Sequence, residues 1–189
     1  MWAARAAALA LCLALAGCSR AEPTPAPCPE VDAGAAGAAV DQALLGFLSV
    51  ARSSHHKADL LEQNGDLAAA TRALEQLLTG AKPSGTRPEV SEVLADTHAR
   101  LADLYSRQGQ IAAAEKSIAA GLELAPDPTY FRGHLFEVRG LLEERNAEAL
   151  TKAGEADEAK RARERALSAF EEAVRIQKHV IEGAAPGRP

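Results

Sequence analysis

Apolar residues recur at helical spacing along most of this chain, and the pattern predicts an all-α fold. Between Val40 and Leu61 they stand three or four positions apart, which places them on one face of a helix. The same spacing returns after each turn signal, whereas strand-forming residues cluster nowhere. The predicted helices span about residues 40–64, 67–78, 89–107, 111–124, 127–152 and 155–182.

Breaks in the apolar pattern separate these six helices. Gly65, Gly109 and Gly154 each follow a helical segment and predict turns. Residues 80–87 contain both proline and glycine and predict a longer loop. The six helices should therefore pair as three hairpins with short turns.

Two of the helix starts carry capping signals. Thr86 and Glu89 form a candidate capping box, and Pro88 suits a first turn. Asp127 is expected to cap the fifth helix, with Pro128 at its first position.

The segment 95–128 resembles a tetratricopeptide repeat, a helical hairpin with a period of about 34 residues. In such a hairpin small residues let the two helices approach, and large ones fill the groove between neighbouring hairpins. The matching residues in chain order are Leu101, Ala102, Tyr105, Gly109, Ala114, Ile118, Gly121 and Pro126. The resemblance implies a turn at Gly109 and an end of the unit at Pro126.

Two weaker copies of the pattern flank this segment. In the upstream copy, residues 65–77 match the turn and the second helix of the repeat, and the other copy lies downstream. In the downstream copy Gly140 and Ala166 stand 26 positions apart, against 12 for Ala102 and Ala114. The excess predicts about two extra turns on each helix of the last hairpin. We therefore expect three TPR-like antiparallel hairpins in a short α-solenoid, with the last one elongated. The alternative is an unrelated six-helix bundle.

The composition agrees with helices and excludes some functions. Of the 189 residues, 47% are hydrophobic but only 4% are aromatic, and alanine and leucine dominate. Such residues lose little entropy on entering a helix. The net charge of -5 argues against nucleic acid as a partner.

The chain begins with the pattern of a cleaved leader. Arg5 precedes the apolar run 6–16, which is too short for a span that takes about 20 apolar residues. The run ends in Leu15, Ala16, Gly17 and Cys18. This motif resembles the lipobox of bacterial lipoproteins, which implies cleavage before Cys18 and a lipid on its thiol. The alternative is an ordinary secretory signal cut elsewhere, for example after Ala21.

The organisation follows from these two resemblances. We expect a signal peptide at 1–17, a lipid-anchored Pro/Gly/Ala-rich spacer at 18–38, a TPR-like helical domain at 39–182 and a disordered tail at 183–189. Two or more acyl chains, such as palmitate, anchor a protein stably. The lipobox implies the bacterial cell envelope, and Ser19 beside the lipid implies the outer membrane, facing the periplasm. Cys28 has no candidate partner within the mature chain.

Candidate catalytic and metal sites are absent from the sequence. His55 and His56 are neighbours on a helix and point about 100° apart, so they cannot chelate one ion together. No catalytic arrangement or phosphate loop occurs, so we expect no enzyme and no cofactor besides the lipid on Cys18. The basic residues within 160–165 are expected to form a solvated face, with an Asp157–Arg161 ion pair.

Together these features predict a non-enzymatic, membrane-tethered scaffold that binds a protein or peptide during envelope assembly or secretion. In a solenoid the first helix of each hairpin lines the concave face. The polar candidates on those helices are Ser54, Lys57, His98, Arg100, Asp103 and Arg107. Two alternatives remain open: a structural or oligomerising lipoprotein, and a carrier of small ligands between helices. The pattern leaves the oligomeric state open.

Overall fold

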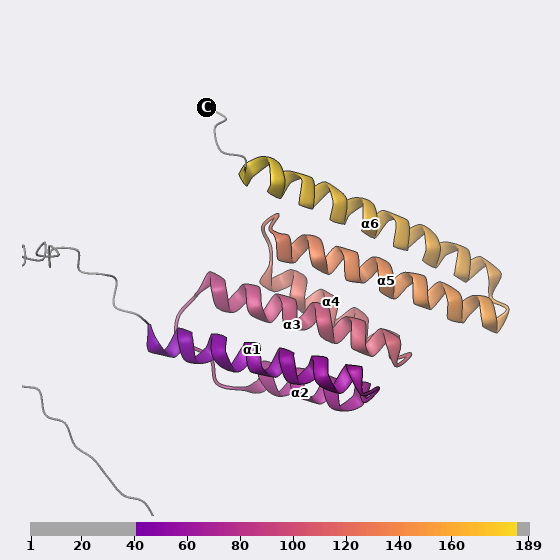
Figure 1. Cartoon of the computed structure of the whole chain (residues 1–189). Helices are drawn as coiled ribbons and strands as arrows, with labels where there is room; N and C mark the ends of the chain where they lie inside the picture. Colours follow the sequence, from indigo (N-terminus) through magenta and orange to yellow (C-terminus); the bar gives the residue numbers. More distant parts are fainter. Residues whose placement is uncertain (1–40, 185–189) are drawn as a thin grey trace, which may run out of the picture. The chain divides into compact units, whose positions relative to one another are not determined.

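The computed structural model describes residues 41–184, which form six helices and no strand (Figure 1). The helices are α1 (Gln42–Gln63), α2 (Leu67–Thr79), α3 (Pro88–Arg107), α4 (Ile111–Leu124), α5 (Tyr130–Ala153) and α6 (Ala156–Ala184). The prediction of an all-α fold with six helices is confirmed. The predicted signal peptide and spacer, at 1–17 and 18–38, lie outside the described residues.

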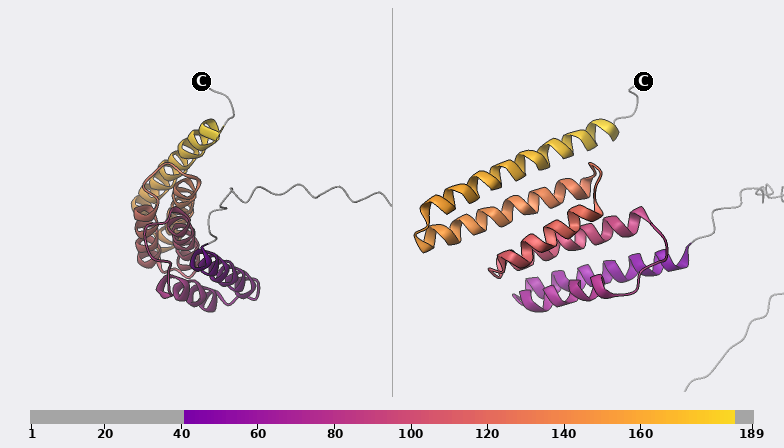
Figure 2. Two further views of the ribbon diagram at one scale, coloured as in Figure 1. Left: turned by 90° about the vertical axis from the view of Figure 1, so that its left-hand side faces the viewer. Right: turned by 180° about the vertical axis from the view of Figure 1, so that it is seen from behind.

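The helices pack as three successive hairpins, α1–α2, α3–α4 and α5–α6. The first helix of the second and of the third hairpin packs on both helices of the hairpin before it. Thus α3 contacts α1 and α2, and α5 contacts α3 and α4. This stepwise packing is that of an α-solenoid. Seen along the helix axes in Figure 2, the hairpins of residues 41–184 follow one another along a curve.

Alanine and leucine build the core, and small residues lie at the closest helix contacts. Ala102 of α3, Ala114 of α4 and Leu135 of α5 are fully buried in one cluster that joins these three helices. Leu101 and Leu104 lie on another side of α3, where they pack against Leu74 and other buried residues of the first hairpin. One helix, α3, therefore connects the first hairpin to the rest of the stack.

The turns and lengths of the hairpins agree with the sequence pattern. Gly65, Gly109 and Gly154 have φ of 78°, 74° and 83°, a left-handed conformation that glycine adopts without steric cost. The last hairpin is the longest, since α5 and α6 have 24 and 29 residues whereas α3 and α4 have 20 and 14. The predicted elongation is therefore confirmed, but its predicted division into about two turns on each helix is wrong. The excess is about one turn on α5 and about four turns on α6.

The predicted capping box of α3 is wrong. The N-cap of this helix is Arg87, which makes no side-chain capping bond, although Pro88 does occupy the first position. The guanidinium of Arg87 instead forms an ion pair with Asp41, the N-cap of α1. The tertiary contact between two helix starts thus replaces the local box at Thr86 and Glu89.

The predicted start of α5 is also wrong, by two residues. Asp127 does not cap this helix, because the N-cap is Thr129, whose hydroxyl accepts a bond from the N–H of Arg132. The N–H of Thr129 donates to the carbonyl of Asp127 at 2.8 Å, so residues 127–128 form a bend before the helix. At the other end, α6 extends to Ala184, two residues beyond the predicted boundary.

The last helix departs from a regular repeat. In the described chain α6 packs on α5 alone and does not contact α4. Its buried face consists mainly of alanine, including Ala162, Ala166 and Ala169. None of the helices within 41–184 combines the length and apolarity needed to cross a membrane.

The contact between α3 and α4 can be tested at Ala114, which is fully buried. Ala114→Leu should destabilise the fold by about 1–3 kcal/mol, because overpacking forces neighbouring helices apart. Thermal unfolding followed by circular dichroism measures the loss. Ala112→Leu is the matched control, since Ala112 lies on the exposed side of the same helix and should change stability by less than about 0.5 kcal/mol. Equal melting of the two variants would contradict the packing described above.

Candidate binding groove

The first helices of the three hairpins line a groove on the inner side of the curve. Two adjoining hollows form it, each of about 390 Å³. Residues of α1, α3 and α5 line both hollows, and Asp96 of α3 belongs to each of them. The groove is therefore continuous across all three hairpins.

The first hollow combines an apolar floor with a polar rim. Leu48 of α1, Val93 of α3 and Phe131 of α5 supply apolar surface. Arg52 and His56 are exposed on α1 and border the same hollow. Such a surface can accept one apolar side chain of a ligand while polar groups fix its orientation.

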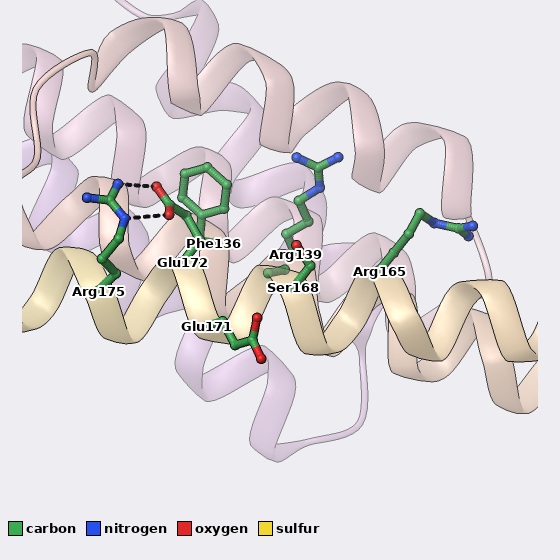
Figure 3. A pocket seen from close by; sticks show the side chains of 8 residues that line it. Phe136, Arg139, Arg165, Ser168, Glu171, Glu172 and Arg175 are labelled. Carbon is green, nitrogen blue, oxygen red and sulfur yellow. Dashed lines mark hydrogen bonds and ion pairs between the residues drawn. The ribbon is translucent and has the colours of Figure 1, made fainter.

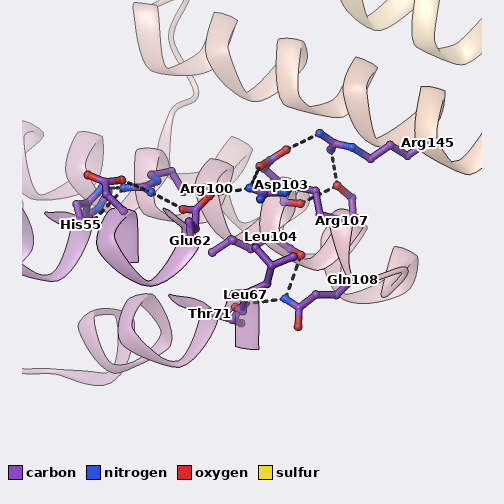
Figure 4. Close-up of polar contacts among 12 residues, drawn as sticks. His55, Glu62, Leu67, Thr71, Arg100, Asp103, Leu104, Arg107, Gln108 and Arg145 are labelled. Carbon is purple, nitrogen blue, oxygen red and sulfur yellow. Dashed lines mark hydrogen bonds and ion pairs between the residues drawn. The ribbon is translucent and has the colours of Figure 1, made fainter. Parts of the chain in front are cut away.

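A chain of ion pairs crosses the second hollow (Figure 4). One Arg100 nitrogen, Nη2, lies 2.6 Å from Asp59 Oδ1 and 2.7 Å from Glu62 Oε1. Arg107 Nη1 donates to the other oxygen of Glu62 at 2.6 Å, and this hydrogen bond raises the pKa of Arg107. These charges tie α1 to α3.

The same network continues to α5. Arg145 lies 2.9 Å from Asp103 Oδ1 and donates to Ser106 Oγ at 2.6 Å. Asp103 also lies 3.3 Å from Arg107, so a single series of alternating charges spans three helices. Half-buried charge networks of this kind fix geometry more than isolated surface pairs do.

Histidines border Asp96, where the two hollows meet. His55 Nδ1 lies 3.7 Å from Asp96 Oδ2, and His134 Nε2 lies 3.9 Å from the other oxygen. The second ring nitrogen of His55 bonds to Thr97 Oγ1 at 2.9 Å. Burial lowers the pKa of His55, and the charge of Asp96 opposes this shift.

Two further polar groups lie inside the stack rather than in the groove. The Nδ1 atom of His98 is buried without a hydrogen-bond partner, and burial lowers the pKa of this side chain. The hydroxyl of Tyr105 donates to Glu75 of α2 at 2.5 Å. Burial first, and this bond second, raise the pKa of Tyr105 to about 12.

Of the six polar residues expected on the concave face, two line the groove and a third is paired with residues that do. Arg100 and Asp103 border the second hollow, and Arg107 joins their ion-pair network. Ser54 and Lys57 instead border a separate shallow hollow formed by α1 alone. The sixth, His98, lies against Gly121 of α4. A Cβ added to this glycine would be 3.2 Å from the Cβ of His98.

The sequence pattern did not predict several residues that line the groove or pair with its charges, namely Asp59, Glu62, Asp96, His134 and Arg145. A signal for part of this set exists in the sequence. Residues 96, 100, 103 and 107 alternate in charge at spacings of four, three and four, which places them along one face of α3. Their partners on α1 and α5 could be found only from the packing of the hairpins.

The residues of the central repeat occupy the following positions. Leu101, Ala102, Ala114, Ile118 and Gly121 are buried, Tyr105 is half-buried, and Gly109 and Pro126 are exposed in connections. At Gly121 an added Cβ would lie 2.5 Å from Leu135 Cδ2, so α5 leaves no room for a side chain there. Leu15, Ala16, Gly17 and Cys18 of the lipobox, and Cys28, lie outside the described residues.

The outer side of the last hairpin carries another hollow, of about 530 Å³ (Figure 3). Glu172 pairs there with Arg175, and Arg165 pairs with Glu143 of α5. The predicted pair of Asp157 with Arg161 is not formed, since Arg161 bonds to Glu158, one turn away. Most charges around this hollow therefore already have partners.

Within residues 41–184 no group of three or more histidine, cysteine or acidic side chains could hold a metal ion.

Comparison with known proteins agrees with the fold. A family profile described as Tetratricopeptide repeat matches residues 95–128, which include most of α3 and all of α4. No curated protein matches the chain. The architecture and this match define a TPR-like helical domain, a class that generally forms non-catalytic scaffolds for protein–protein interaction.

Acidification should destabilise the fold through two histidines. Burial holds the pKa of His55 and His98 below 6.5, so the unfolded chain takes up protons first as the pH falls. The contribution of these groups to the free energy of unfolding should be constant well above pH 6.5. It should fall as the pH drops below 6.5 towards the lowered pKa values of the folded state. Urea unfolding at a series of pH values measures this. The double variant His55→Gln/His98→Met should show a flatter profile, and an unchanged slope would refute the assignment.

Proposed function

We propose that this protein is a membrane-tethered scaffold of the bacterial cell envelope that binds a segment of a partner protein in its concave groove. The observation that carries this proposal is the continuous groove formed by α1, α3 and α5, with an apolar hollow at one end and a charged one beside it. TPR-like domains commonly bind protein partners.

The chemistry of the groove favours a peptide segment as ligand. The hollow bordered by Leu48, Val93 and Phe131 accepts an apolar anchor side chain. The exposed Arg52 and His56 at its rim supply donors for the peptide backbone or for an acidic side chain. A helix or extended segment that crosses α1, α3 and α5 would use both features at once.

The groove is preformed, because its walls are fixed by internal contacts. Arg100 and Arg107 join α1 to α3, and Arg145 joins α3 to α5. A surface held in its binding geometry loses less conformational entropy when a ligand docks. This rigidity supports binding of a specific segment more than the carrying of varied small molecules, the alternative function.

The proposed location in the cell rests on the sequence. The lipobox at residues 15–18 supports cleavage before Cys18 and attachment of acyl chains, among them palmitate. The spacer at 18–38 would hold the helical domain away from the lipid surface. Because serine follows Cys18, we place the protein at the outer membrane, facing the periplasm. Envelope assembly or secretion is the setting in which such a scaffold would act.

Site-specific photocrosslinking tests the groove. A photoreactive amino acid at Arg52 or His56, both exposed at the first hollow, should crosslink to one protein in intact cells. The same group at Arg72, exposed on α2 and not part of the groove, is the control and should give no such product. Val93→Arg, which fills the apolar hollow with a charge, should abolish the crosslink. A product of equal yield from all three positions would contradict binding in the groove.

Lipidation is tested at Cys18, since only its thiol can accept the lipid in the proposed motif. Cys18→Ala should leave an uncleaved precursor or release the domain from the membrane. Immunoblotting of membrane and soluble fractions shows both the size and the location of the protein. Cys28→Ala is the control and should be processed normally. Normal size and membrane association in the Cys18 variant would refute the anchor but would leave binding in the groove untouched.

A further inference from the structure

The last helix exposes a line of apolar side chains. Leu167, Val174 and Ile181 are 64%, 54% and 69% exposed, although the same helix buries five alanines and Ile176. They stand seven residues apart, about two turns each, so they lie along one flank of α6. Single exposed apolar residues are common, but a contiguous line indicates an interaction surface. We refer to these three residues as the apolar stripe.

The stripe lies on the flank of α6 that is turned away from the outer hollow. Arg165, Ser168 and Arg175 border that hollow, and the helical period places them about 100° or more around α6 from the stripe. Glu171, which also lines the hollow, lies between the two surfaces. Between the stripe and α5, the half-buried Phe170 packs tightly over Gly140, where an added Cβ would meet its ring at 2.6 Å. The close approach of the two helices brings the stripe next to the exposed side chains of α5.

Acidic side chains of α5 lie beside the same contact between α5 and α6. Glu137 and Glu144 follow Gly133 and Gly140 of α5 by one turn each, so they lie beside the contact with α6. Both are exposed, and Glu137 lies 3.4 Å from His134, its nearest charge partner. We refer to Glu137 and Glu144 as the acidic ridge.

The far border of the stripe adds no net charge. Lys160, Glu164, Glu171 and Lys178 stand there on α6, two of each sign. Arg163, one turn before Leu167 in line with the stripe, adds one positive charge and donates to Thr151 Oγ1 at 2.8 Å. The two carboxylates of the acidic ridge outweigh it, so the whole surface is acidic.

We infer that this surface binds a basic amphipathic helix of a partner protein. The first helix of each later hairpin covers the hairpin before it, as α3 and α5 do, whereas no helix of residues 41–184 covers α5–α6 in this way. A partner helix in that position would place its apolar side on the stripe and its Lys or Arg residues beside the ridge. A second copy of this chain would bring its own acidic ridge and the balanced charges beside its own stripe, so it complements the ridge less well.

The experiment uses two synthetic helical peptides of about 20 residues, long enough to cover the stripe. Both carry leucine at heptad spacing; the remaining positions are lysine in one peptide and glutamate in the other. Fluorescence anisotropy measures their binding to the full chain. The lysine peptide should bind at least about tenfold more tightly than the glutamate peptide, and added salt should reduce the difference. Equal binding of both peptides would overturn the inference.

Matched variants locate the binding. Leu167→Asn/Val174→Asn should weaken binding of the lysine peptide at least about tenfold. The control Leu45→Asn/Val50→Asn replaces the same residue types on α1, at 50% and 57% exposure, and should leave binding within about twofold. Glu137→Lys/Glu144→Lys should reverse the preference, so that the glutamate peptide binds more tightly. Circular dichroism confirms that all variants keep their helix content.

A stripe variant that binds like wild type would refute the site. Sedimentation velocity of the full chain adds an independent outcome. If wild type is a dimer and Leu167→Asn/Val174→Asn converts it to a monomer, the stripe joins two copies of this chain, and the inference of a basic partner helix is wrong. Neither result decides the fate of the concave groove, because no residue of the stripe or the ridge lines its two hollows. Glu137 touches the edge of the groove only through His134.

Discussion

Close contact between small residues on successive helices is the constraint on which this structure depends. Ala102 and Ala114 are fully buried where α3 meets α4, and Gly121 leaves room for Leu135 of α5. A helical hairpin alone cannot bury its apolar face, so each one needs the next. Because these contacts fix the distance between helices, they also fix the width of the groove on the inner side of the curve.

The two hollows of the groove differ in how far their charges are already paired within the protein. Arg100 and Arg107 meet Glu62, and Arg145 meets Asp103, so most charges in the second hollow already have partners. They hold the three first helices in place. In the function proposed above, recognition falls to the neighbouring hollow, which is lined by apolar side chains and bordered by the exposed Arg52 and His56. A ligand there docks on a wall that the ion pairs have already positioned.

The last hairpin differs from the other two in length and in packing. Its longer helices and the separation of α6 from α4 expose surfaces that a regular repeat would cover. One of them is the outer hollow, whose charges are largely paired. The other carries the apolar stripe and the acidic ridge, and it remains open at the end of the described chain. The protein thus presents two different surfaces, a groove across the stack and a face at its end.

The sequence by itself determined the helices, because their apolar period and glycine turns are local properties of the chain. It also indicated the repeat at 95–128 and the longer final hairpin, since both depend on spacing along the chain. Only the tertiary structure decided which charges meet. Asp41 pairs with Arg87 in place of a local capping box, and His98 lies inside the stack rather than in the groove. These outcomes depend on the rotation of each helix against its neighbours, which is set by packing between residues far apart in the sequence.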